Sequence, residues 1–127
     1  MTDVPVAGVS VCHCYMCQRW SGGLFATFDA PANAVSVTGA VMHHRSSHLS
    51  ERAFCPKCGS NLWIRDHADD ADFELIAGIF PDAATFPLIS EIYIDQAPAY
   101  VPLAGDHPRK TADQYEATNP FVKGDTP

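Results

Sequence analysis

The chain has 127 residues, of which 46% are hydrophobic and 18% charged, and its net charge at pH 7 is −7. This length predicts a single domain and this composition a globular one, which excludes an intrinsically disordered chain. The acidic balance without any Lys/Arg cluster excludes a nucleic-acid partner, and no apolar run is long enough for a membrane span. Residues 1–10 lack the basic start and apolar core of a signal peptide, so we expect a cytoplasmic protein.

The first half of the chain predicts short strands joined by turns, because alternating and β-branched stretches are separated by Gly, Ser, Asn and Pro. The expected strands cover residues 8–11, 24–29, 35–39, 41–44 and 51–54. Residues 35–39 alternate most cleanly, which is typical of a half-buried strand. We expect a turn at residues 18–23 and a loop or single helical turn at residues 31–34.

The second half continues this pattern. The expected strands cover residues 62–65, 73–78 and 90–94, the last with Ile92 and Ile94 facing inward. Residues 67–72 predict a polar hairpin loop and residues 81–86 a short helix, while the chain from residue 98 onward is Pro-rich and polar. Ten prolines also disfavour long helices. We therefore expect residues 1–127 to form one mainly β domain with very little helix.

Five cysteines, an odd number, favour thiolate chemistry over complete disulfide pairing in a reducing compartment. Zinc prefers thiolates arranged in a tetrahedron. The segment CPKCG at residues 55–59 is a strong form of the Cys-x-x-Cys turn, because proline stiffens it and Gly59 permits a positive φ. Cys55 and Cys58 are therefore candidate metal ligands.

Cys12, Cys14 and Cys17 place three thiolates within six residues, so all three could bind one metal. A site with three protein ligands leaves a fourth position for water or substrate, as in catalytic zinc sites. Spacing alone supports equally well a closed structural zinc held by Cys14, Cys17, Cys55 and Cys58, with Cys12 left over. A redox dithiol in a thioredoxin-like fold is disfavoured because no βαβ pattern surrounds the motif.

Two segments carry a resemblance to a known family. The segment VCHCYMCQRWSGG at residues 11–23 resembles the CHCxxC segment of the glutathione-dependent formaldehyde-activating enzyme family, which includes centromere protein V. The segment RAFCPKCGSNL at residues 52–62 is similar to the family's second cysteine signature, and residues 77–98 resemble its C-terminal half. The likeness covers residues 8–103, which leaves residues 104–127 as an expected loose tail.

The resemblance implies a zinc-binding β-tent fold with two zinc sites. Cys12, Cys14 and Cys17 match the ligands of the open, catalytic zinc, whereas Cys55 and Cys58 match half of the structural zinc. The implied activity is that of a carbon–sulfur lyase, in which a thiol such as glutathione adds reversibly to a small aldehyde such as formaldehyde. The product is an S-hydroxymethyl adduct.

The chain departs from the family pattern because the upstream Cys-x-Cys-Gly segment that completes the structural zinc is absent. We expect a truncated start or a lost first strand, and exposed strand edges of that kind favour a homodimer. Cys55 and Cys58 would then share Cys14 and Cys17, use a histidine, or bind no metal. Glu91 stands where many family members have histidine.

A few other side chains are candidates for the site. His13 could serve as a ligand or as an acid–base group, although a residue between two ligands more often points away from the metal. Arg19 and Arg52 could bind carboxylates of a glutathione-like thiol, since guanidinium groups suit them, but ordinary ion pairs explain either arginine equally well. The histidines at positions 43, 44 and 48 and the aspartates at positions 69, 70 and 72 fit solvated loops and strand ends better than metal sites.

Two functions from different classes therefore compete. The first is a zinc-dependent carbon–sulfur lyase whose metal, held by Cys12, Cys14 and Cys17, ionises a thiol. The second is a non-catalytic zinc module that binds a partner protein or represents a truncated family member. An enzyme needs an exchangeable metal position in a pocket, whereas a structural module needs only a closed site.

Overall fold

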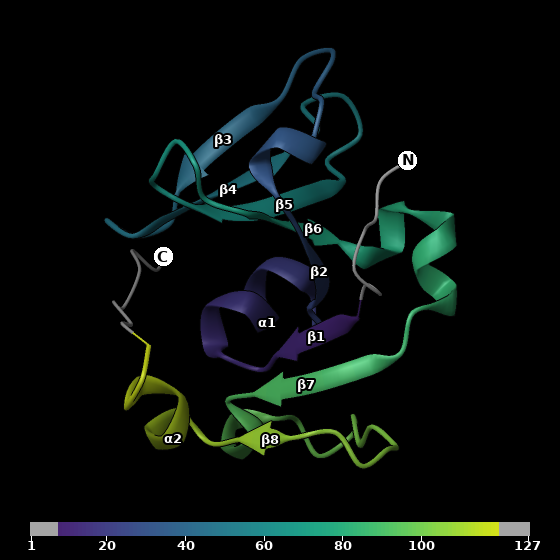
Figure 1. Cartoon of the computed structure of the whole chain (residues 1–127), viewed down its shortest axis with the longest axis vertical. Coiled ribbons are helices and arrows are strands. Elements are labelled where there is room, and N and C mark those ends of the chain that lie inside the picture. The colour runs from purple at the N-terminus through teal and green to yellow at the C-terminus, as the bar shows by residue number, and fades with distance from the viewer. Residues whose placement is uncertain (1–7, 120–127) are drawn as a thin grey trace.

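A computed structural model describes residues 8–119, and within them the strands form one eight-stranded sheet in the order β3-β4-β5-β6-β2-β1-β7-β8 (Figure 1). The strands are β1 Val9–Cys12, β2 Ala26–Ala30, β3 Met42–Arg45, β4 Ser50–Phe54, β5 Asn61–Asp66, β6 Phe73–Ile76, β7 Leu88–Ile92 and β8 Arg109–Lys110. The α-helices are α1 Tyr15–Ser21 and α2 Ala112–Glu116, and short 3₁₀ turns cover Ala32–Ala34, Ala77–Ile79, Pro81–Thr85 and Ile94–Gln96. The expectation of a mainly β protein with little helix is confirmed.

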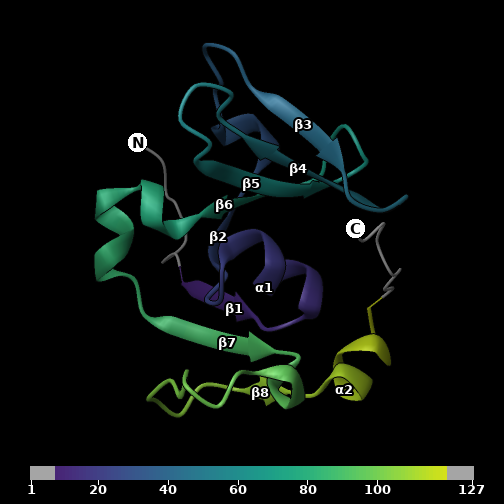
Figure 2. The same ribbon diagram turned by 180° about the vertical axis from the view of Figure 1, so that it is seen from behind.

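Neighbouring strands from β3 to β1 pair antiparallel, whereas β7 runs parallel to both β1 and β8. Parallel neighbours require long connections, because the chain must return to the same end of the sheet. The connection between β1 and β7 contains the whole β2–β6 part of the fold. In both views α1 lies between the β3–β5 part and the β7–β8 part of the sheet (Figures 1 and 2).

Alternation along the strands divides the buried side chains between two clusters. Trp63, Phe73 and Leu75 pack in one cluster, with the Trp63 and Phe73 rings edge to face at 5.1 Å. The other cluster contains Cys14, Cys17, Phe25 and Tyr93 and lies around α1. The cysteine motif is therefore part of a hydrophobic core and is not an exposed turn.

The turn expected at residues 18–23 is largely helical. α1 begins after Cys14, whose carbonyl oxygen accepts the Gln18 amide at 2.9 Å, and it ends at Gly22 with φ 88°. The Gln18 side chain also donates to the His13 carbonyl oxygen at 2.7 Å. The prediction was right about the break at Gly22 and wrong about the residues before it, because the segment that carries Cys12 and Cys14 winds directly into the helix.

The strand expected at residues 35–39 is absent from the structure, where residues 35–41 form a loop. Val35 packs beside the Trp63 cluster, whereas the Val37 side chain is 48% exposed. Gly39 has φ 91°, which favours glycine and turns the chain. One half-buried valine thus accounts for the apolar signal without strand pairing.

Residues 104–119, the first part of the expected loose tail, contain β8 and α2. Arg109 in β8 donates hydrogen bonds to the Leu103 and Gly105 carbonyl oxygens, both at 2.9 Å. Thr111 and Gln114 form a capping box at the start of α2. Residues 120–127 of the expected tail lie outside the described residues.

The end of β7 agrees with the expected inward positions only in part. Ile92 is half-buried and packs against the cluster around α1, whereas Ile94 lies beyond β7 in a 3₁₀ turn. Glu91 and Tyr93 are almost completely buried. Glu91 can occupy the interior because polar side chains from His13, His107 and Arg109 surround it. Within residues 8–119, the helices are too short or too polar to cross a bilayer.

Candidate functional site

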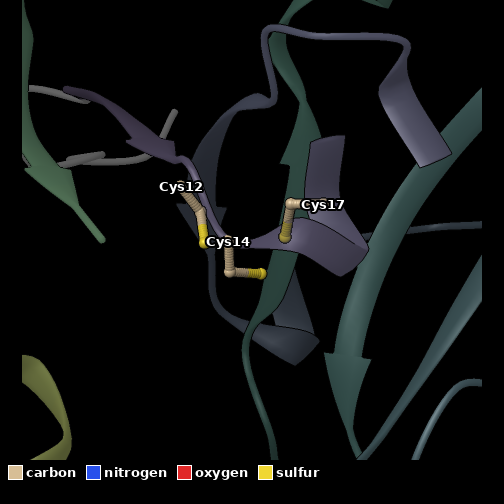
Figure 3. A group of neighbouring side chains, drawn as sticks. All are labelled: Cys12, Cys14 and Cys17. Carbon is tan, nitrogen blue, oxygen red and sulfur yellow. The ribbon is translucent and has the colours of Figure 1, made fainter. Parts of the chain in front are cut away.

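Three cysteine sulfur atoms gather where β1 meets α1 (Figure 3). The Sγ atoms of Cys12, Cys14 and Cys17 all lie within 4.8 Å of one another. Cys12 ends β1, Cys14 is the N-cap of α1, and Cys17 follows in the first helical turn. The strand and the helix thus direct the three thiols to one point, and Cys14 and Cys17 are buried there.

The donor set suits a thiophilic metal. A tetrahedral zinc with Zn–S bonds of ~2.3 Å needs sulfur atoms roughly 3.8 Å apart, which a cluster of this size accommodates. Among residues 8–119, no fourth His, Cys, Asp or Glu side chain joins the group. These three cysteines could therefore hold a metal ion and leave part of its coordination sphere to water or substrate.

The three thiols are linked by hydrogen bonds, which shift their pKa values. Hydrogen bonds from Cys12 and Cys17 lower the pKa of Cys14 to about 3, while the hydrogen bond with Cys14 raises the pKa of Cys12. One sulfur of the group is therefore held as a thiolate, which is the form that binds metal.

Arg52 on β4 places a positive charge beside the thiols. Its Nη2 lies 3.7 Å from the Cys17 Sγ, and its guanidinium group stacks over the Trp20 ring at 5.0 Å and near the Phe25 ring at 5.7 Å. The side chain is 5% exposed, and its buried Nη1 has no hydrogen-bond partner among the described residues. The guanidinium group thus donates to the sulfur cluster through Nη2, while its buried Nη1 is left without a partner among the described residues.

The cysteine cluster opens into a cavity of about 220 Å³. Its walls include the three cysteines, Arg52, Glu74 and Tyr93, and Tyr115 of α2 completes one side. Tyr93 has a left-handed backbone with φ 57°, which costs free energy for a non-glycine residue and is common at functional sites. Its hydroxyl donates to Glu116 Oε2 at 2.8 Å, which ties the end of β7 to α2.

A second cavity of about 450 Å³ adjoins the first and shares Cys12, Glu74 and Tyr115 with it. Asp29, Asp66 and Asp72 also line this second space. Burial raises the pKa of Glu74 to about 7, and the nearby carboxylates of Asp29 and Asp66 contribute to that rise. Glu74 is thus a carboxyl group that titrates near neutral pH at the junction of the two cavities.

His13 does not point into the cavity. Its Nε2 lies 2.7 Å from Glu91 Oε1, and its amide donates to the Ile92 carbonyl oxygen at 3.0 Å. The second oxygen of Glu91 accepts hydrogen bonds from His107 and from Arg109 Nε, the latter at 3.1 Å. Burial alone would raise the pKa of Glu91, but the hydrogen bonds from His107 and His13 outweigh burial and lower it.

This network holds the peptide between Cys12 and Cys14, two of the candidate metal ligands, against β7. It therefore gives His13 and Glu91 structural partners, and neither residue lines the cavity beside the sulfur cluster.

The structure does not bring the second cysteine pair to the first. Cys55 is half-buried and Cys58 is exposed, with its Sγ 3.2 Å from Ser60 Oγ. Within the described part of the chain, no third ligand side chain joins this pair, so the closed site with Cys14 and Cys17 is not formed. Arg19 is exposed on α1 and does not line the cavity.

Several residues that shape the site were not predicted from the sequence, namely Glu74, Glu91, His107 and Tyr115. The FELI segment of β6 carried one usable signal, since a single glutamate interrupts an apolar run. The remaining residues lie far apart in the sequence and meet through the pairing of β7 with β1 and β8 and through the packing of α2.

Comparison with known proteins gives two results. Residues 1–96 match the model of a family described as glutathione-dependent formaldehyde-activating enzyme. An uncharacterized lyase of Schizosaccharomyces pombe is 26% identical over 107 residues, covering 84% of this chain and 78% of the relative. The matched residues of the family model include the cysteine cluster and Arg52 and end before α2.

Proposed function

Because this chain belongs to the glutathione-dependent formaldehyde-activating enzyme family, we propose that it is a carbon–sulfur lyase acting on thiol–aldehyde adducts. The proposed substrates are a glutathione-type thiol and a small aldehyde of the formaldehyde type. The single observation that carries the proposal is the group of three cysteine sulfurs on the wall of a cavity large enough for small molecules. A non-catalytic zinc module requires no such cavity.

We assign the metal-binding role to Cys12, Cys14 and Cys17, and zinc is the ion that this donor set suits best. When bound, zinc would supply Lewis acidity and would favour the ionised form of a thiol. The protein's own contribution is to keep the three sulfurs together and partly out of water, through β1 and the first turn of α1. We propose no metal at Cys55 and Cys58, where a third ligand is lacking among residues 8–119.

Arg52 is the proposed anion-binding group of the cavity. Its unpartnered Nη1 is a donor that a substrate oxyanion or carboxylate would satisfy, and a buried donor left unpaired costs free energy. The same guanidinium group donates to Cys17, so it also stabilises the thiolate cluster. Arg19 is left out of this role because it is exposed and does not line the cavity.

The test is the rate at which the zinc-loaded protein interconverts glutathione plus formaldehyde with their S-hydroxymethyl adduct, measured by exchange NMR. We expect the wild type to accelerate exchange above the uncatalysed rate. Arg52→Gln should lose on the order of 10²-fold in kcat/KM, because one charge-assisted donor is worth roughly 2–3 kcal/mol. Arg19→Gln is the matched control and should stay within about twofold of wild type, as expected for a surface charge. A zinc-loaded wild type that leaves the exchange rate unchanged contradicts the proposal.

A further inference from the structure

Glu74 is placed on the cavity side of the sheet by strand alternation. Its neighbours Phe73 and Leu75 belong to the Trp63 cluster, so the side chain between them faces the opposite side, where the cysteines lie. It lines both the cavity of the cysteine cluster and the adjoining acidic cavity. No hydrogen bond or ion pair within residues 8–119 engages its carboxyl group.

Charged and titratable groups face Glu74 from every side. Asp29 lies opposite it on β2, and Asp66 on β5 and Asp72 in the β5–β6 loop are near enough to act on its charge. Arg52 on β4 is the cation that acts in the opposite sense, and Tyr115 of α2 completes the surroundings. Burial and three carboxylates outweigh one guanidinium, so the pKa of Glu74 rises to about 7.

We propose that Glu74 is the general acid–base group that moves the hydroxyl proton of the thiol–aldehyde adduct, an inference that rests on the proposed function. In cleavage, the Glu74 carboxylate takes the hydroxyl proton, and the electron pair of that O–H bond forms the carbonyl π bond. The C–S bond breaks, and its electron pair leaves on sulfur as a thiolate. Addition runs the same steps backwards, with the protonated Glu74 supplying the proton to the new alkoxide, and no oxidation or reduction occurs.

The other groups that line the cysteine cavity are less suited to this role. Arg52 remains protonated. Burial raises the pKa values of Tyr93 and Tyr115, so neither phenol accepts a proton near neutral pH. Asp66 is exposed at the end of β5. Among the described residues, Glu74 is the half-buried carboxyl group on the cavity wall. A group with a pKa close to the working pH is the most efficient acid–base catalyst.

The experiment measures kcat/KM for cleavage of S-hydroxymethylglutathione between about pH 5.5 and 8.5, together with the metal content of each variant. For the wild type, kcat/KM should rise with pH through about 7 as Glu74 becomes ionised. In Glu74→Gln, kcat/KM at pH 8 should fall about 100-fold, because general acid–base catalysis contributes roughly 10²–10⁴-fold. The increase of kcat/KM with pH should also disappear. The metal content of Glu74→Gln should equal that of the wild type.

Asp72→Asn is the matched variant that leaves Glu74 in place. It removes one carboxylate that raises the pKa of Glu74, so the rise should shift to lower pH. A purely structural role for Glu74 would not produce that shift. Glu74→Asp keeps a carboxyl group, so its kcat/KM should be lower than that of the wild type but should still increase with pH. This variant provides the test if Glu74→Gln does not fold.

The outcomes separate this inference from the proposed function. Two results with an active wild type overturn the role of Glu74 alone. In the first, kcat/KM of Glu74→Gln stays within twofold of wild type. In the second, the increase of kcat/KM with pH is unchanged in Asp72→Asn and absent in Glu74→Asp. A zinc-loaded wild type with no activity on the adduct overturns the proposed function and this inference together.

Discussion

At the scale of single residues, the site depends on how each buried charge is compensated. Glu91 is 1% exposed, yet three cationic or hydrogen-bonding side chains surround its carboxylate. Arg52 is 5% exposed and is compensated by a sulfur atom and aromatic rings. Glu74 lacks such partners among the described residues and consequently titrates near neutral pH. Hydrogen-bond partners thus distinguish Glu91, whose carboxylate is held in a structural network, from Glu74, for which we propose an acid–base role.

Glu91→Gln tests the structural carboxylate. Because the folded-state pKa of Glu91 lies below its usual value of 4.5, its charge stabilises the fold above that pH and loses this effect as the pH falls through the folded pKa. We expect Glu91→Gln to lose about 3 kcal/mol in the free energy of unfolding at pH 7, since it leaves buried partners unpaired. The difference from wild type, measured by urea denaturation, should shrink as the pH is lowered below 4.5 and through the folded-state pKa of Glu91.

Glu51→Gln is the matched control for this prediction, because Glu51 pairs with His43 at 2.7 Å on an exposed surface. Exposed pairs contribute little, so the control should change stability by less than about 1 kcal/mol at pH 7. Equal losses in the two variants would show that the buried network has no special structural role.

At the scale of elements, local patterns in the sequence predicted most strands, whereas features that depend on pairing were missed. Six of the expected strands overlap β1–β6, and a seventh overlaps β7, because alternation and turn residues are local signals. Residues 35–39 had the same alternation but lack a partner strand in the described fold. β8 and α2 were missed because a two-residue strand and a five-residue helix have too little periodicity to detect.

The candidate site was predicted only in part for the same reason. The spacing of Cys12, Cys14 and Cys17 is local, so the motif could be identified from the sequence, whereas spacing could not distinguish a three-cysteine group from a closed four-cysteine site. Arg52 was a candidate on its residue type alone. Glu74 and Tyr115 reach the cavity through the order of β6 in the sheet and the docking of α2, which no local pattern encodes.

α2 gives a prediction at this scale, because it closes the cavity yet lies beyond the residues matched by the family model. Thr111 Oγ1 accepts the Gln114 amide at 3.2 Å, and replacing such a cap by alanine costs about 1 kcal/mol. Thr111→Ala should therefore speed hydrogen exchange at the Gln114 and Tyr115 amides about fivefold, measured by NMR. Thr85→Ala removes a hydroxyl from the 3₁₀ turn Pro81–Thr85 and should leave those amides unchanged. Equal exchange in wild type and Thr111→Ala would contradict the proposed cap.

At the scale of the whole molecule, one bent sheet carries the three-cysteine motif on its inside. α1 lies between the two ends of the sheet, and the β3 and β8 strands form its edges (Figures 1 and 2). β3 is exposed along its whole length, and the homodimer expected from exposed edges remains a prediction for sedimentation analysis. Within residues 8–119, one group of three side chains could hold a metal ion, whereas the family resemblance implied two zinc sites.

The proposed function requires one metal ion bound at Cys12, Cys14 and Cys17. The most direct test is the zinc content per purified chain, by elemental analysis, in the wild type, Cys12→Ser and Cys58→Ser. We predict about one zinc per wild-type chain, its loss in Cys12→Ser and its retention in Cys58→Ser, because Cys58 stands apart from the sulfur cluster. Zinc that survives in Cys12→Ser and disappears in Cys58→Ser would contradict the account and would indicate a closed structural site.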